Sequence, residues 1–320
     1  MSVFTFADLF AGIGGMRIAF ERAGGTCVLT CEINEQALQT YQLNFKDGPD
    51  HVLVRNVLSL KARDFPVKPE ELDVLVAGFP CQPYSIAGLR QGLEDDRGGE
   101  IFTSLLGILR TVKPKAFLLE NVRGIQSHDN GATFEYMLDE LETQGYTLRF
   151  ETLTTQDHAN IPQTRARVFI VGFRSKDAAS SFQFPKKVKL TRTIHDCLET
   201  EKVDDRFYYD ERYGATQQIL SEVIKRDTIY QWRRHYVREN KSNACPTLTA
   251  NMGSGGHNVP LVRDRYGVRK LTPRETANFQ GFPKSFKLPD IALSHLYHQF
   301  GNSVTVPLIE RIARNIAKVI

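Results

Sequence analysis

The stretch VFTFADLFAGIGG, residues 3–15, predicts a strand that runs directly into a tight, glycine-rich turn. Val3 to Leu9 is an apolar strand with Asp8 near its end. Residues 16–23 continue as an amphipathic helix, because apolar side chains recur on one side at helical spacing. A strand, a turn and a helix in this order are typical of an α/β fold.

The turn in this stretch is suited to a ligand with a negatively charged group. Its glycines let the backbone approach a ligand closely, and the N-terminus of the next helix favours a negative charge. A second strand, residues 27–31, leads to Glu32, twenty residues after Gly12. At that spacing an acidic side chain reaches the ribose hydroxyls in a Rossmann unit.

The glycine spacing also narrows the kind of ligand. Gly15 follows Gly14 directly, which departs from the dinucleotide pattern G-x-G-x-x-G and disfavours an NAD-dependent dehydrogenase. A nucleoside without phosphates fits better, since an amino-acid carboxylate would take the helix N-terminus. S-adenosylmethionine is such a molecule. The alternative is that the glycines form only a tight turn between strand and helix.

A candidate nucleophile follows the apolar run at residues 72–78. Pro80 should end this strand and place Cys81 at the carboxyl edge of the sheet, where open α/β sheets build their sites. A thiol reacts as thiolate, so a helix N-terminus or a cation such as Arg97, Arg165 or Arg167 should favour its ionised form. The alternative is that Cys81 is a small buried apolar residue.

The α/β alternation continues downstream. We expect strands over 116–119, 147–153 and 168–173 and a helix over 134–143. Glu120 follows the first of these strands, and Arg165 and Arg167 precede the last, with both guanidinium groups on one face. Cys81, Glu120 and Arg165 should therefore converge. Residues 307–320 have helical periodicity and should pack back on the N-terminal part of the chain.

Six motifs, in order along nearly the whole chain, resemble those of the C5-cytosine DNA methyltransferase family. They lie at residues 8–15, 80–82, 120–122, 163–167, 269–283 and 299–304. The resemblance implies an α/β, Rossmann-like, S-adenosylmethionine-dependent methyltransferase domain with a mixed, mostly parallel sheet, plus a small irregular target-recognition domain. We place the catalytic domain at 1–186, completed by 286–320, and the target-recognition domain and hinge at 187–285.

The resemblance implies DNA (cytosine-5-)-methyltransferase activity and assigns roles to four catalytic residues. Cys81 would attack carbon 6 of the cytosine, Glu120 would offset charge on the ring, and Arg165 would bond the base carbonyl oxygen. Arg167 would brace the loop that carries Cys81. An ion pair between Glu120 and Arg165 is the structural alternative. The cytosine must leave the duplex stack, and residues 86–99 have the length to close over it, unless they form an ordinary surface loop.

The cofactor implied by the resemblance is S-adenosylmethionine. Two positions depart from the family pattern, because Asn56 stands where Asp is usual and Ile33 where an aromatic residue is usual, so cofactor affinity is expected to be lower. The predicted cofactor-binding residues are Asp8, Phe10, Gly12, Gly14, Gly15, Glu32, Ile33, Asn56, Pro80, Asn302 and Val304.

The partner implied by the resemblance is double-stranded DNA. The net charge of the chain is +4, and residues 186–270 alone hold 17 Lys and Arg against 11 Asp and Glu, which suits a polyanion or a solvated surface. Tyr230, Trp232 and Tyr236 in this segment suit base contacts or the core of the small domain. The predicted DNA-binding residues are Gln82, Ser85, Arg97, Arg233, Arg234, Thr249, Asn251, Gly255, Gly256 and His257.

The remaining features exclude other classes. The five cysteines show no metal-ligand spacing, so no metal is expected, and we see no signal peptide or membrane-spanning run. The protein is expected to be soluble, cytoplasmic or nuclear, and monomeric. Two alternatives stay open: a tRNA cytosine-5 methyltransferase of the same family, and a catalytically silent DNA-binding protein. We expect no direct binding to a cognate restriction endonuclease encoded nearby.

Overall fold

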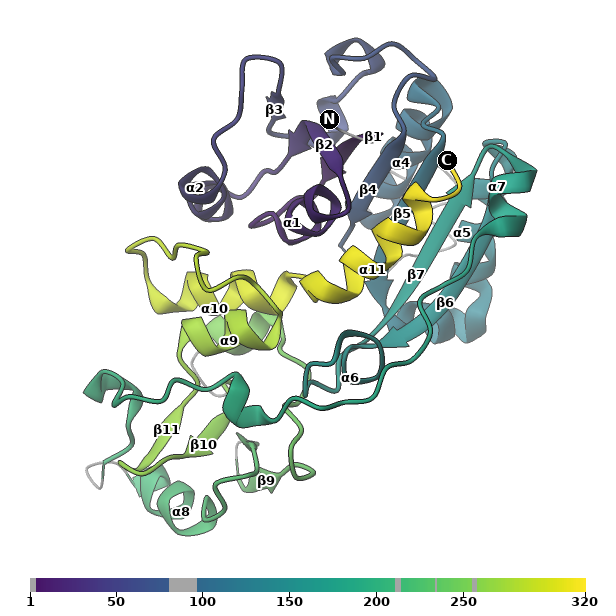
Figure 1. Cartoon of the computed structure of the whole chain (residues 1–320). Helices are drawn as coiled ribbons and strands as arrows, with labels where there is room; N and C mark the ends of the chain where they lie inside the picture. The colour runs from purple at the N-terminus through teal and green to yellow at the C-terminus, as the bar shows by residue number, and fades with distance from the viewer. Residues whose placement is uncertain (1–3, 81–96, 211–213, 234, 255–257) are drawn as a thin grey trace.

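The computed structural model describes residues 4–80, 97–210, 214–233, 235–254 and 258–320 (Figure 1). Within these residues the strands form one seven-stranded sheet and one four-stranded sheet. The order of the large sheet is β3-β2-β1-β4-β5-β7-β6. β1 to β5 pair in parallel, whereas β7 runs antiparallel to both of its neighbours. The predicted mixed, mostly parallel sheet is therefore confirmed.

The strands of the large sheet alternate with helices along the chain. The strands are β1 Phe4–Leu9, β2 Gly25–Cys31, β3 Val52–Val54, β4 Val74–Gly78, β5 Ala116–Val122, β6 Thr147–Thr154 and β7 Ala166–Phe173. The helices packed with it are α1 Gly15–Arg22, α2 Glu35–Asn44, α4 Arg97–Val112, α5 Ala132–Thr143, α6 Thr155–Ala159, α7 Lys176–Ser181 and α11 Val306–Ala317. Short 3-10 segments include η1 Val57–Ser59 and η3 Arg123–Gly131.

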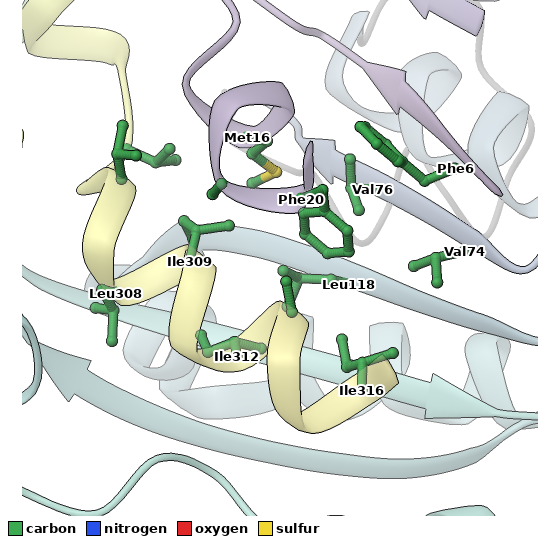
Figure 2. Close-up of a cluster of buried hydrophobic side chains, with 14 of the residues drawn as sticks. Phe6, Met16, Phe20, Val74, Val76, Leu118, Leu308, Ile309, Ile312 and Ile316 are labelled. Carbon is green, nitrogen blue, oxygen red and sulfur yellow. The ribbon is translucent and has the colours of Figure 1, made fainter. Parts of the chain in front are cut away.

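The two faces of this sheet carry separate hydrophobic cores, because successive side chains of a strand point to opposite faces. On one face Val74 and Val76 of β4 pack with helices α1 and α11. On the other face Leu75 and Ala77 pack with α4 and α5. Figure 2 shows α11 against the first core, with Ile309 and Ile312 directed into it. The C-terminal helix thus returns to α1, as its periodicity predicted.

The sheet brings the ends of several strands to one edge. β1, β4 and β5 are parallel and in register, with Leu9 beside Ala77 and Gly78 beside Glu120. β7 is antiparallel to β5, so its first residues lie beside the last residues of β5, with Arg167 opposite Val122. The carboxyl ends of three parallel strands and the start of β7 therefore share one edge.

The second sheet is small and antiparallel, in the order β11-β10-β8-β9. Its strands are β8 Tyr230–Trp232, β9 Val237–Glu239, β10 Leu261–Arg263 and β11 Val268–Lys270, and it packs on α8 Gly214–Glu222. Tyr230 is buried there, whereas Tyr236 is 55% exposed. Helices α9 Pro273–Phe279 and α10 Leu293–Asn302 lie between this sheet and the large one (Figure 1). No helix in the described ranges is long and apolar enough to span a membrane.

Candidate active site

A cavity of about 440 Å³ lies at the edge of the large sheet where these ends meet. The turn after β1, the ends of β4 and β5, the start of β7 and the end of α10 form its wall. Ten residues predicted to bind the cofactor or to act in catalysis line it: Phe10, Gly12, Gly15, Glu32, Pro80, Glu120, Arg165, Arg167, Asn302 and Val304. The topology thus gathers residues that lie far apart in the sequence.

The turn after β1 is held in shape by Glu32. The backbone amide of Gly12 donates to Glu32 Oε2 at 2.7 Å, and the amide of Asn34 donates to Glu32 Oε1 at 2.7 Å. Gly12 has φ +57, and a Cβ added there would meet no described atom within 4 Å. Gly14, with φ 83, is the N-cap of α1, and no side chain caps this helix. Backbone donors at the start of α1 are therefore available to a negatively charged ligand group.

Glu120 and Arg167 form an ion pair on the cavity wall. Arg167 Nε lies 3.0 Å from Glu120 Oε1, and both side chains are largely buried. The structural alternative, in which Glu120 pairs with Arg165, is therefore wrong, because the partner is Arg167. Arg165 precedes β7, whereas Arg167 lies in the strand, where pairing with β5 brings it to Glu120.

Arg165 instead holds three carbonyl oxygens. Its Nη1 donates to Leu248 O at 2.8 Å and to Gly301 O at 3.2 Å, and its Nη2 donates to Ser303 O at 2.6 Å. Burial, together with the charge of Arg167, lowers the pKa of this guanidinium to about 9. These contacts occupy both terminal nitrogens, whereas the buried Nε of Arg165 has no hydrogen-bond partner among the described residues, so a bond from Arg165 to the base stays a prediction. Through these bonds Arg165 links the segment at Leu248 to the end of α10.

The loop predicted to carry the nucleophile is only partly described. Cys81, Gln82 and Ser85 lie outside the described residues, as does most of 86–99. The chain leading to Cys81 is in place: Phe79 and Pro80 line the cavity, and Asn121 Nδ2 donates to Phe79 O at 3.3 Å. We did not predict a role for Asn121, although its place directly after Glu120 in the motif was a usable signal.

Four predicted cofactor residues are not on the cavity wall. Asp8 is buried beneath it, and burial raises the pKa of this carboxyl to about 8. Gly14 caps α1, and Ile33 is 65% exposed. Asn56 Oδ1 accepts from the amide of Leu58 at 3.0 Å and caps η1. The acceptor of Asn56 therefore already has a partner within the chain.

Two buried glutamines, for which we predicted no role, bond to α9, to α10 and to the segment at Leu248. Gln163 Nε2 donates to Phe279 O at 2.7 Å, and Gln163 Oε1 accepts from the amide of Leu248. Gln280 Nε2 donates to Phe300 O at 2.7 Å. Both glutamines are fully buried, so each of these amide bonds replaces lost hydration.

Three of the predicted DNA-binding residues, Arg233, Thr249 and Asn251, line a second, polar hollow of about 330 Å³. Arg97 is the first residue of α4. Arg234, Gly255, Gly256 and His257 lie outside the described residues.

Comparisons with known proteins place the chain among DNA methylases. The family model of the C-5 cytosine-specific DNA methylase matches residues 4–318. Type II methyltransferase M.Bsp6I of Bacillus sp. (strain RFL6) is 49% identical over 98% of this chain and 98% of its own. Type II methyltransferase M.HpaII of Haemophilus parainfluenzae is 36% identical over 98% of this chain and 89% of its own.

Solved structures share the fold. The S. pombe Dnmt2 methyltransferase superposes with a TM-score of 0.72 at 22% identity, covering 98% of both chains. A putative DNA modification methyltransferase encoded within an E. coli prophage superposes with a TM-score of 0.71 at 21% identity, covering 99% of both.

Proposed function

The chain belongs to the C-5 cytosine-specific DNA methylase family and is a DNA cytosine-5-methyltransferase, and from this premise we propose that it works through a covalent intermediate on Cys81. The thiolate adds to carbon 6 of the cytosine, and the electrons of the 5,6 double bond move toward carbon 5. Carbon 5 takes the methyl group. Loss of the carbon 5 proton then restores the double bond and expels the thiolate.

The observation that carries this proposal is the Glu120–Arg167 pair, 3.0 Å apart on the wall of the cavity toward which Phe79 and Pro80 lead. Glu120, as the acid or sharing a proton with ring nitrogen 3, offsets the charge that develops on the ring. We assign to Arg167 the role first given to Arg165, whose terminal nitrogens both bond carbonyl oxygens. Arg167 Nε faces Glu120 and its Nη1 donates to Ala166 O, which leaves Nη2 for the base. It bonds the base carbonyl oxygen.

The family and fold imply a methyl donor of the S-adenosylmethionine type. When bound, this cofactor supplies an electrophilic methyl group. The residues present fit it: the uncapped start of α1 suits its carboxylate, Glu32 suits its ribose hydroxyls, and the surface beside Gly12 is open. Phe10, Gly15, Asn302 and Val304 on the same wall complete the proposed pocket.

The substrate we propose is a short specific site in duplex DNA, with the target cytosine flipped out of the stack. Attack at carbon 6 needs access to the face of the ring, which stacking blocks. Residues 187–285 form the target-recognition domain and hinge in this proposal, and residues 1–186 with 286–320 form the catalytic domain. Within the hinge, however, Ala277 and Phe282 pack in the core beside α1 and α11. These apolar contacts suit a hinge that stays docked on the catalytic domain.

Trapping with 5-fluorocytosine tests the mechanism. Because fluorine at carbon 5 cannot leave as a proton does, wild type should form a denaturation-resistant adduct with duplex DNA containing this base. Cys81→Ser should form none and lose methyl transfer by several orders of magnitude while still binding DNA. Substantial turnover by the serine variant would reject Cys81 as the nucleophile. Transfer of labelled methyl groups to tRNA in preference to duplex DNA would favour the RNA-directed alternative.

A further inference from the structure

We propose that the polar hollow beside β8 and β9 recognises a guanine next to the target cytosine, with Arg233 as the residue that contacts the base and Gln231 as the residue that positions it. This inference rests on the proposed function, since it needs a duplex bound over the cavity. It assigns a chemical task to a hollow that the catalytic steps do not use.

The hairpin of β8 and β9 has one apolar and one polar face. Gln231 pairs with Arg238 across the two strands, so residues at alternate positions from them share a face. Gln231, Arg233, Arg238 and Asn240 all line the hollow. The opposite face, with Tyr230, packs on α8. The apolar side chains of the hairpin therefore pack in the core of the small sheet, whereas its polar side chains line the hollow.

The charge of the hollow favours a ligand rich in hydrogen-bond acceptors. Its described wall consists of two arginines, four side-chain amides, three threonines and one proline, without any carboxylate. Neither Arg233 nor Arg238 forms an ion pair with a carboxylate in the described ranges. Arg233 Nη2 donates to Gln231 Oε1 at 3.1 Å, and Gln231 is 8% exposed. One edge of the guanidinium is thus held, while its other donors have no hydrogen-bond partner among the described residues.

These groups suit a base edge better than a phosphate. A phosphate offers only acceptors, so the amide oxygens of Asn240 and Asn258 would gain nothing from it, while that of Asn251 already accepts from Thr249 Oγ1. The major-groove edge of a G·C pair offers the O6 and N7 acceptors of guanine, which a guanidinium bonds through two donors, and the N4 donor of cytosine, which an amide oxygen accepts. A hollow that combines guanidinium and amide groups therefore matches a G·C pair.

The hollow directly adjoins the catalytic cavity. Thr164 on its wall precedes Arg165, and Thr249 follows Leu248, whose carbonyl oxygen Arg165 holds. The backbone of Thr249 also lies against Gly301 on the cavity wall, where a Cβ would come within 2.2 Å of Thr249 C. The backbone of Thr249 therefore belongs to the hollow and also contacts the wall of the cavity. A base pair close to the flipped cytosine is therefore the part of the duplex that this hollow reaches.

The test uses the recognition sequence found by bisulfite sequencing of DNA from cells that express the full chain. Duplexes in which each guanine in turn is replaced by 7-deazaguanine, which lacks the N7 acceptor, are titrated against wild type and Arg233→Ala. Wild type should lose roughly tenfold in affinity at one guanine position. Arg233→Ala should bind the unmodified site more weakly and show no further loss at that position. Gln231→Ala should retain part of this sensitivity.

The control variant is Arg265→Ala, which removes the same charge from the turn between β10 and β11, outside the hollow. It should keep the full sensitivity to 7-deazaguanine. Arg233→Ala could instead bind all duplexes more weakly by the same factor, with the salt dependence of binding reduced by about one unit and the sensitivity to 7-deazaguanine unchanged. That result would make the hollow a phosphate site and overturn the proposal. A failure of the proposed function would show separately, as absence of the 5-fluorocytosine adduct in wild type.

Discussion

Arg167 Nε lies 3.0 Å from Glu120 Oε1, where the end of β5 runs beside the start of β7. The antiparallel pairing of these strands, with Arg167 opposite Val122, brings the two charges to one wall of the cavity. Because both side chains are largely buried, removing one partner would leave the other charge buried without compensation. A substitution of Arg167 therefore acts directly on Glu120.

Lysine substitutions of the two arginines should have different effects, one on turnover and the other on stability. Arg167→Lys keeps a charge beside Glu120 but loses the planar fork, so turnover should fall about 100-fold with a nearly unchanged melting temperature. Arg165→Lys loses bonds to at least one of its three carbonyls and should lower the melting temperature by roughly 4 °C or more. Calorimetry and single-turnover methylation measure both. Lost turnover with unchanged stability in Arg165→Lys would return the base contact to Arg165.

Glu32 should determine cofactor affinity. Glu32→Gln removes the charge that accepts from the amide of Gly12 at 2.7 Å and that faces the proposed ribose position. S-adenosylhomocysteine should bind roughly tenfold more weakly by titration calorimetry, while the turnover rate at saturating cofactor stays near wild type. Glu35→Gln, at an exposed carboxylate paired with Arg55, is the control and should bind normally. Equal losses in both variants would contradict the role of Glu32.

Asp8 should make stability depend on pH. Burial raises its pKa from 3.8 to about 8, so the folded chain keeps a proton that the unfolded chain releases. This group therefore lowers the free energy of unfolding as the pH rises from about 4 to about 8. Asp8→Asn should melt higher than wild type at pH 8, by roughly 2 °C or more, and the difference should shrink toward pH 5. A difference that is constant across this range would refute the raised pKa.

Gly301 should be essential for the seating of the segment at residues 249–250. An added Cβ would lie 2.2 Å from Thr249 C and 2.4 Å from the amide nitrogen of Ala250, and backbone atoms cannot move aside as a flexible side chain can. Gly301→Ala should destabilise the protein by roughly 2 kcal/mol or more in denaturant unfolding. Gly107→Ala, in α4 with no described atom outside that helix within 4 Å of the added Cβ, should be neutral or stabilising. Similar effects of both substitutions would rule out the close approach.

The local pattern of the sequence determined the strands and the turn that build the cavity. Nearly continuous apolar runs form β1, β4 and β5, and the glycines after β1 supply the positive φ values of Gly12 and Gly14. Glu32 lies where its spacing from Gly12 predicted, because one helix and one strand span a nearly constant length. These features depend on near neighbours in the chain, so a single sequence contains them.

Tertiary structure alone decided which side chains meet. Arg165 and Arg167 are equivalent in the sequence pattern. Only the register of β7 against β5 places Arg167, and not Arg165, beside Glu120. The carbonyls that Arg165 holds come from residues 248, 301 and 303, about 80 to 140 positions further along the chain. Backbone carbonyls have no sequence signature, since every residue carries one. Which of them lies within reach of a guanidinium depends on how the two sheets and α10 pack, and that is a property of the whole fold.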